Sequence, residues 1–146
     1  MKKLKFITLF LTIALVAVSC ESYDDYDTDR DTVAGFTKKT QNINSIPQDG
    51  EKSTTVDVFA SDVKSFERTF SVVTVPVTNP EENTPTAENN YRYDATVTIP
   101  ANERLGTLTV TGVDNSLTSD RTFFMLSIQG GDDVVSGGTI MIGLKN

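Results

Sequence analysis

The stretch YRYDATVTIPANERLGTLTVTGV, residues 91–113, contains two segments in which apolar and polar side chains alternate. Residues 91–99 place two Tyr, Ala, Val and Ile on one side, with Arg, Asp and Thr on the other. Residues 105–113 place Leu108 and Val110 opposite a row of threonines. Because side chains alternate between the two faces of a β-strand, this period of two predicts two strands, each with one buried face. Residues 100–104, which begin with proline, predict the turn between them.

The same period of two recurs on both sides of this stretch, and no helical period competes with it. About seven short strands are expected, at residues 33–37, 54–60, 66–77, 91–99, 105–113, 121–129 and 139–144. Within 66–77 the apolar phase changes between Val72 and Val73, which predicts a bulge or a crossing between sheets. The polar segment 79–90 (NPEENTPTAENN) is expected to be a loop. The pattern predicts an all-β fold, an antiparallel Greek-key β-sandwich over residues 33–146.

The N-terminus is typical of a targeting segment. Three lysines within the first five residues precede an apolar run at residues 6–18. As a helix this run would be about 20 Å long, which is too short for a bilayer core of about 30 Å. Residues 1–19 are therefore predicted to be a secretory signal peptide that is removed on export.

Cys20 follows the small-residue sequence Ala17-Val18-Ser19 and is the only cysteine of the chain. It cannot form an intramolecular disulfide, and a free thiol in an exported protein would be open to oxidation. The four residues resemble a bacterial lipobox, although Ala17 stands where leucine is commonest. The resemblance implies a lipoprotein acylated at Cys20, with palmitate among the acyl groups, and held on the membrane. A cysteine left as a free thiol is the alternative.

Residues 20–32 are predicted to be a flexible acidic tether. Residues 21–31 carry six acids against one base, without apolar periodicity, so the segment cannot bury enough surface to fold. Loss of the signal peptide removes three lysines and takes the net charge from −7 to −10. The acids after the cysteine resemble the surface-export signal of Bacteroidetes lipoproteins, which implies a surface-exposed outer-membrane protein. A spacer without export function, or a periplasm-facing orientation, is the alternative.

The composition excludes several classes of function. The 146-residue chain has no histidine, which removes catalytic and metal-binding arrangements built on imidazole. Its acidic balance argues against binding to nucleic acid. The acids that could pair for glycoside hydrolysis lie in predicted loops, where solvated charge is the simpler interpretation; they are Glu81, Glu82, Glu88, Asp132 and Asp133. No enzyme activity and no cofactor are therefore expected.

Residues 90–128 resemble the second half of a Calx-beta domain. The resemblance rests on four segments, which are Tyr91-Arg-Tyr-Asp, Thr98-Ile-Pro-Ala-Asn, Leu108-Thr-Val-Thr and Arg121-Thr-Phe-Phe-Met-Leu-Ser-Ile. It implies an immunoglobulin-like sandwich, and the leader and tether make the chain similar to sandwich lipoproteins of Bacteroidetes glycan-uptake systems. Calx-beta domains that bind Ca²⁺ have clustered acids in the loop matching residues 113–121. Here that loop offers Asp114 and Asp120 as weak candidates, and a simple turn is favoured over a metal site.

The strand at 121–129 carries apolar residues on both of its faces. If Thr122, Phe124, Leu126 and Ile128 face the core, then Phe123 and Met125 face away from it, and the same reasoning turns Met141 outward. The resulting patch is interpreted either as a contact surface or as a surface covered by the loop at 79–90 or by the N-terminal segment. Tyr91 and Tyr93 are expected to be core residues with hydroxyls at the rim.

These observations together predict a non-catalytic, lipid-anchored protein of the cell envelope. Its expected role is that of an accessory module that binds a glycan or an envelope protein, with the membrane as its other partner. The alternatives are a structural adhesin-like or matrix component, or a weakly Ca²⁺-binding Calx-beta domain.

Overall fold

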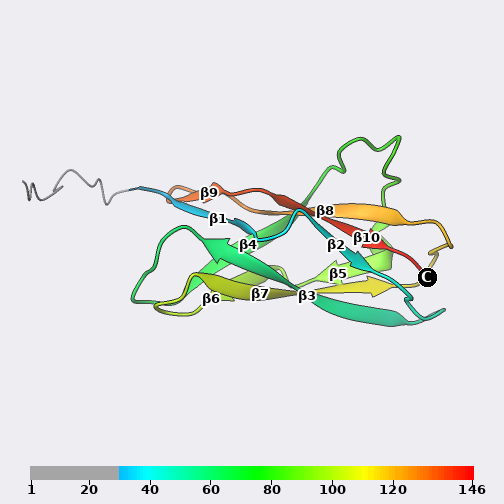
Figure 1. Cartoon of the computed structure of the whole chain (residues 1–146), viewed down its shortest axis with the longest axis horizontal. Coiled ribbons are helices and arrows are strands. Elements are labelled where there is room, and N and C mark those ends of the chain that lie inside the picture. Colours follow the sequence, from blue (N-terminus) through cyan, green and yellow to red (C-terminus); the bar gives the residue numbers. More distant parts are fainter. Residues whose placement is uncertain (1–29) are drawn as a thin grey trace, which may run out of the picture. The chain divides into compact units, whose positions relative to one another are not determined.

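The computed structural model describes residues 30–146. The signal peptide, Cys20 and the tether up to residue 29 lie outside the described residues. The folded unit spans residues 31–146 and contains ten strands and one 3₁₀ helix, η1 (Glu88–Asn90), as Figure 1 shows. No helix within residues 30–146 is long and apolar enough to cross a membrane.

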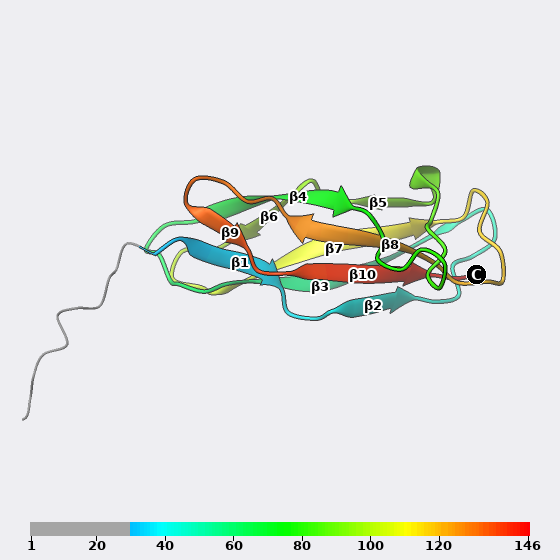
Figure 2. The same ribbon diagram turned by 90° about the horizontal axis from the view of Figure 1, so that it is seen from above.

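The ten strands form two five-stranded sheets, seen edge-on and from above in Figures 1 and 2. The first sheet has the order β5 (Tyr91–Tyr93), β7 (Leu105–Val113), β3 (Glu51–Ala60), β1 (Thr32–Phe36) and β9 (Val134–Ser136). The second has the order β2 (Thr40–Ile43), β10 (Thr139–Leu144), β8 (Thr122–Ile128), β4 (Arg68–Val75) and β6 (Thr96–Ile99). The predicted all-β sandwich is confirmed, but it is not wholly antiparallel as expected, because β1 pairs with β9 and β2 pairs with β10 in parallel. The sandwich has ten strands instead of seven. The short strands β2 and β9 were not predicted, and the strand predicted at 91–99 is divided into β5 and β6.

The chain changes sheets after every strand, and three of these changes were not indicated by the alternation pattern. β1 and β9 pair in parallel in the first sheet, and the strands that follow them, β2 and β10, pair in parallel in the second. The expected strand at 91–99 is divided: β5 pairs with β7, and β6 pairs with β4. Ala95, expected to face inward, is exposed at this division. Two of the new strands, β2 and β9, have only four and three residues, too few for a clear alternation.

The phase change predicted near Val72 marks a change of pairing partner. The first half of β4, Arg68 to Ser71, pairs with β6, whereas Val72 to Val75 pairs with β8. The strand remains in the second sheet throughout, so the expected crossing between sheets does not occur here. Phe66, the first residue of the strand predicted at 66–77, lies before β4 and is 60% exposed.

The core between the sheets consists of the side chains that the period of two turned inward. The most completely buried are Val58, Val97, Ile99, Leu108, Val110, Leu126, Ile128, Ile140, Ile142 and Leu144. Each contributes about 1.5–3 kcal/mol of transfer free energy when buried. The ring of Tyr91, from the first sheet, stacks on Phe124 of the second with centroids 3.9 Å apart. Thr111, expected to face outward, is buried and shares a hydrogen bond with Ser53.

Two glycines permit the chain to change sheets beside β1. The amide of Gly137 donates to the carbonyl of Ala34 at 2.6 Å. A Cβ atom on Gly35 would lie 2.7 Å from the carbonyl carbon of Gly137, closer than side-chain atoms approach a backbone. The absence of a side chain at both positions lets the segment between β9 and β10 cross over β1.

Candidate functional site

β8 and β10 are neighbours in the second sheet, and Met125 lies directly opposite Met141 in their register. Phe123 lies two residues before Met125 in β8, opposite Gly143 of β10. The structure thus places the three residues of the predicted contact surface on two adjoining strands. Met125 is only 6% exposed, whereas Phe123 and Met141 are half-buried.

The segment that follows β4, residues 76–87, covers much of this patch; we call it the strap. The amide and hydroxyl of Thr78 donate to the sulfur of Met125 at 3.4 and 3.7 Å. Further along, the Phe123 amide donates to the carbonyl of Thr84 at 2.9 Å, and the Thr86 amide donates to the Phe123 carbonyl at 2.7 Å. The strap therefore extends the second sheet beside β8 beyond the end of β4. Of the three residues, Met125 is the one whose side chain the strap contacts and buries, whereas Phe123 and Met141 stay partly exposed.

Local sequence shapes the strap. Asn79 adopts φ +53°, a left-handed conformation that asparagine tolerates, and its carbonyl accepts from the amides of Glu82 and Asn83 at 3.0 and 2.9 Å. The side chain of Asn83 closes the same turn by donating to the carbonyl of Thr78 at 3.1 Å. Pro85 pairs with Phe123 at the free edge of β8, where a proline without an amide hydrogen is compatible with an edge position.

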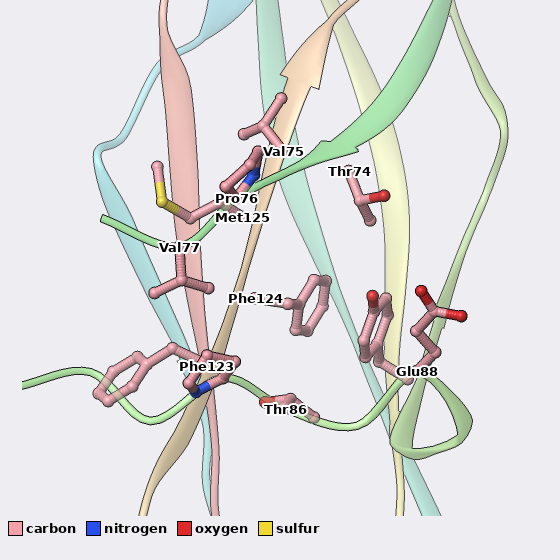
Figure 3. A pocket seen from close by; sticks show the side chains of 11 residues that line it. Thr74, Val75, Pro76, Val77, Thr86, Glu88, Phe123, Phe124 and Met125 are labelled. Carbon is pink, nitrogen blue, oxygen red and sulfur yellow. The ribbon is translucent and has the colours of Figure 1, made fainter. Parts of the chain in front are cut away.

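A hollow of about 310 Å³ opens between the end of β4 and the strap, which we call the Tyr91 hollow. Figure 3 shows Phe124 in the middle of the opening, Pro76 and Val77 on one side, and Thr86 and Glu88 on another. Burial, and then the neighbouring Glu88 carboxylate, raise the pKa of Tyr91 above its usual value. Its hydroxyl is therefore a neutral hydrogen-bonding group at physiological pH. One face of the Tyr91 ring is occupied by Phe124, which leaves that face unavailable for stacking on a sugar.

A second hollow of about 500 Å³ lies on the other side of Met125, where β1 leads into β2 and β9 leads into β10; we call it the Lys38 hollow. Its apolar lining comes from Phe36, Met125 and Met141. Its polar lining comes from the 37–40 segment, Thr78 and the 137–139 segment. The arrangement places two lysines, four threonines and apolar side chains around one hollow. Sequence analysis missed this site, although the lysine doublet 38–39 in an acidic chain was its visible signal.

Asp114, one of the two calcium candidates, is a buried structural carboxylate. One of its oxygens accepts from the amide of Leu117 at 3.0 Å. The other accepts from the amide of Asp49 at 3.3 Å and from the side chain of Asn146 at 3.1 Å. Asp120 is exposed and does not join it in these bonds. Within residues 30–146 no three acidic side chains gather closely enough to hold a metal ion. The carboxylate oxygens of Asp114 are thus engaged by N–H donors that hold the turn.

The other acids considered from sequence lie apart from one another. Glu81, Glu82, Asp132 and Asp133 are exposed. Glu88 is also exposed and lines the Tyr91 hollow. Among the described residues, Glu88 is the only carboxylate that lines either hollow.

The two five-stranded sheets and the core between them define a β-sandwich. No protein-family model matches the chain, and no curated protein matches it in sequence. In structure it is similar to a candidate carbohydrate-binding protein from Bacteroides ovatus, with a TM-score of 0.63 and 11% identity over 78% of this chain. It is also similar to a two-domain protein of unknown function from Bacteroides fragilis, with a TM-score of 0.61 and 12% identity over 82% of this chain.

The chain spans less than half of both Bacteroides proteins, 37% and 46% of their lengths. The apo form of the Calx CBD1 domain matches with a TM-score of 0.54 and 12% identity, over 80% of this chain and 100% of that domain. At such low identity these likenesses show the fold alone. They confirm the Calx-beta-like sandwich expected from residues 90–128.

Proposed function

We propose that this chain is a non-catalytic binding module of the cell envelope, exported, anchored through lipid at Cys20 and directed to a glycan or an envelope protein. The leader, the lipobox-like sequence and the acidic tether support the anchor. The likeness to a candidate carbohydrate-binding protein of Bacteroides ovatus supports a glycan as the first ligand class to test.

The observation that carries the proposal is the presence of two hollows on either side of Met125, at the second sheet. Their volumes, about 310 and about 500 Å³, fall within the range of sites for small ligands. Both combine apolar side chains with a few polar groups, as binding sites do. Neither is lined by the pair of carboxylates that glycoside hydrolysis requires, which supports binding without hydrolysis.

A glycan array with the full chain tests the proposal. Thr139 is an exposed residue of β10 that lines the Lys38 hollow, and Thr139→Phe should block the hollow while suiting the strand. Thr107→Phe is the matched control, because Thr107 is exposed on β7 of the other sheet. We expect wild type and T107F to bind the same saccharides and T139F to lose them. Absence of glycan binding, together with absence of any co-purifying envelope protein, would favour a structural adhesin-like or matrix role.

A further inference from the structure

We propose that the Lys38 hollow binds an anionic saccharide, one that carries carboxylate or sulfate groups. This inference rests on the proposed binding function and names the ligand class. It is carried by the lysines of the hollow, by its hydroxyls and by its apolar lining.

The hollow exists because two neighbouring segments change sheets together. β1 and β9 are paired in the first sheet up to Ala34 and Ser136, and the amide of Met141 meets the carbonyl of Lys39 at 2.9 Å in the second. Between these two paired regions, residues 37–39 and residues 137–138 do not pair as strands with each other. Gly138 adopts φ +127°, and a Cβ atom there would meet nothing within 4 Å, so this wall is bare and open. The fold therefore holds the hollow open without a covering side chain on this wall.

Lys38 and Lys39 supply two positive charges that have no ion-pair partner among residues 30–146. Both side chains are exposed, and none of the carboxylates in residues 30–146 forms an ion pair with either. Other cations are engaged: Lys64 and Arg68 with Asp62, and Arg92 with Glu51. The described residues carry 15 acids against 10 bases. Two adjacent lysines without ion pairs among these residues therefore form a local positive charge on an acidic surface. Since no acid lines the Lys38 hollow, an anion there meets ammonium groups without carboxylate repulsion.

The remaining lining favours a saccharide over an acidic peptide. Phe36 and Met125 are buried, so the apolar surface that the C–H face of a sugar ring can contact comes mainly from the half-buried Met141. The rim carries four threonines, Thr37, Thr40, Thr78 and Thr139. A threonine hydroxyl both donates and accepts hydrogen bonds, which matches the several hydroxyls on each ring of a saccharide. The volume of about 500 Å³ suits a ligand of a few rings at most.

Calorimetric titration of the full chain tests this assignment. The probes are trigalacturonate, which is a uronate, neutral maltotriose of similar size, and a synthetic peptide of residues 21–31. The test variant is Lys38→Gln with Lys39→Gln, and Lys38→Arg with Lys39→Arg keeps the charge. The control variant is Lys52→Gln with Lys145→Gln; Lys52 of β3 donates to the carbonyl of Asn44 just after β2, and Lys145 follows the end of β10. We expect trigalacturonate to bind wild type, the control and the arginine variant, and to bind the glutamine variant at least about tenfold more weakly. Binding should also weaken as salt rises.

Four outcomes would overturn the assignment. Equal binding of trigalacturonate to the glutamine variant would place the glycan elsewhere, and preferential binding of maltotriose would make the ligand a neutral saccharide; both leave the proposed binding function intact. Tighter binding of the 21–31 peptide than of trigalacturonate would make the hollow a seat for the acidic tether of this chain. Failure of wild type to bind any saccharide on the array would remove the glycan-binding function together with this inference.

Discussion

Asp62 ties the first residue of β1 to the loop between β3 and β4. Its carboxylate accepts from Thr32 through both oxygens at 3.1 Å and forms ion pairs with Arg68 at 2.6 Å and Lys64 at 3.1 Å. Partial burial alone would raise the pKa of Asp62, but the hydrogen bonds from Lys64 and Thr32 and the charge of Arg68 outweigh it and lower the pKa below its usual value. A group whose pKa is lowered by folding stabilises the folded state while it is ionised.

Asp62→Asn should therefore destabilise the fold in a pH-dependent way. We expect a loss of about 1–2 kcal/mol near neutral pH, because Arg68, only 9% exposed, would lose its carboxylate. In wild type this contribution is complete above about pH 4 and is lost as the pH falls through the lowered pKa, so the difference should shrink toward about pH 3. Urea unfolding at several pH values measures it, with the exposed Glu67→Gln as control. A difference that stays constant down to about pH 3 would contradict the ion-pair role.

Cys20 is the residue on which the proposed anchor depends. Cys20→Ala should release the protein from the membrane fraction, since acyl chains supply about 0.8 kcal/mol per buried CH₂ group. Ser22→Ala, two residues away, is the control and should leave the protein in the membrane. Mass spectrometry of the wild-type N-terminus should find acyl groups on the cysteine. Wild type that is soluble and free of lipid would show that the lipobox interpretation is wrong.

The strap is the element that decides how the outer face of β8 is used. Changing Phe123 and Met125 together to Ser should cost several kcal/mol of folding free energy, because the Met125 side chain is buried and accepts from Thr78 of the strap, and the Phe123 side chain is half-buried. Met141→Ser, at a half-buried site on the neighbouring strand, should cost less, about 1 kcal/mol. Chemical denaturation compares the two variants. A loss of no more than about 0.5 kcal/mol in the double variant would instead identify an open contact surface.

The crossing beside β1 gives a second prediction for an element. Gly35→Ala should destabilise the sandwich by about 1–3 kcal/mol, because its Cβ atom would meet the backbone of Gly137 at 2.7 Å. Gly131→Ala is the matched control, since a Cβ atom there meets nothing within 4 Å. Thermal unfolding of the two variants measures the difference. Equal stabilities would mean that the crossing can widen without cost.

The response of the whole molecule to calcium follows from how the turn after β7 is held. Because the Asp114 oxygens already accept from Leu117, Asp49 and Asn146, millimolar Ca²⁺ should leave the melting temperature almost unchanged. Asp114→Ala should lower the melting temperature with or without Ca²⁺, whereas Asp120→Ala, at an exposed site, should not. A rise of several degrees in Ca²⁺ that Asp114→Ala abolishes would restore the Calx-beta calcium role.

Across the whole molecule, the alternation of apolar residues was sufficient to predict the sandwich and most of its core. β7 and β10 begin and end where the pattern placed them, and Leu108, Leu126 and Ile142 are buried as expected. This was possible because the period of two is a property of each strand by itself, and burial of one face follows directly from it. The bond from the Leu117 amide to Asp114 is local and lies in the predicted turn, whereas the bonds from Asp49 and Asn146 join segments distant in sequence.

The pairing of strands and the position of the strap were decided by tertiary structure. The apolar residues of β5 and β6 alternate in the same phase, but the two strands lie in different sheets. β5 pairs with β7 at the edge of the first sheet, and β6 pairs with β4 at the edge of the second. Phe123 and Met125 have the outward phase of an exposed patch, yet the strap covers Met125 because β4 ends early and leaves the edge of β8 unpaired. The Lys38 hollow likewise forms only where two segments distant in sequence change sheets side by side. Local periodicity contains no information about which distant backbone groups will satisfy one another, and that choice shapes both hollows.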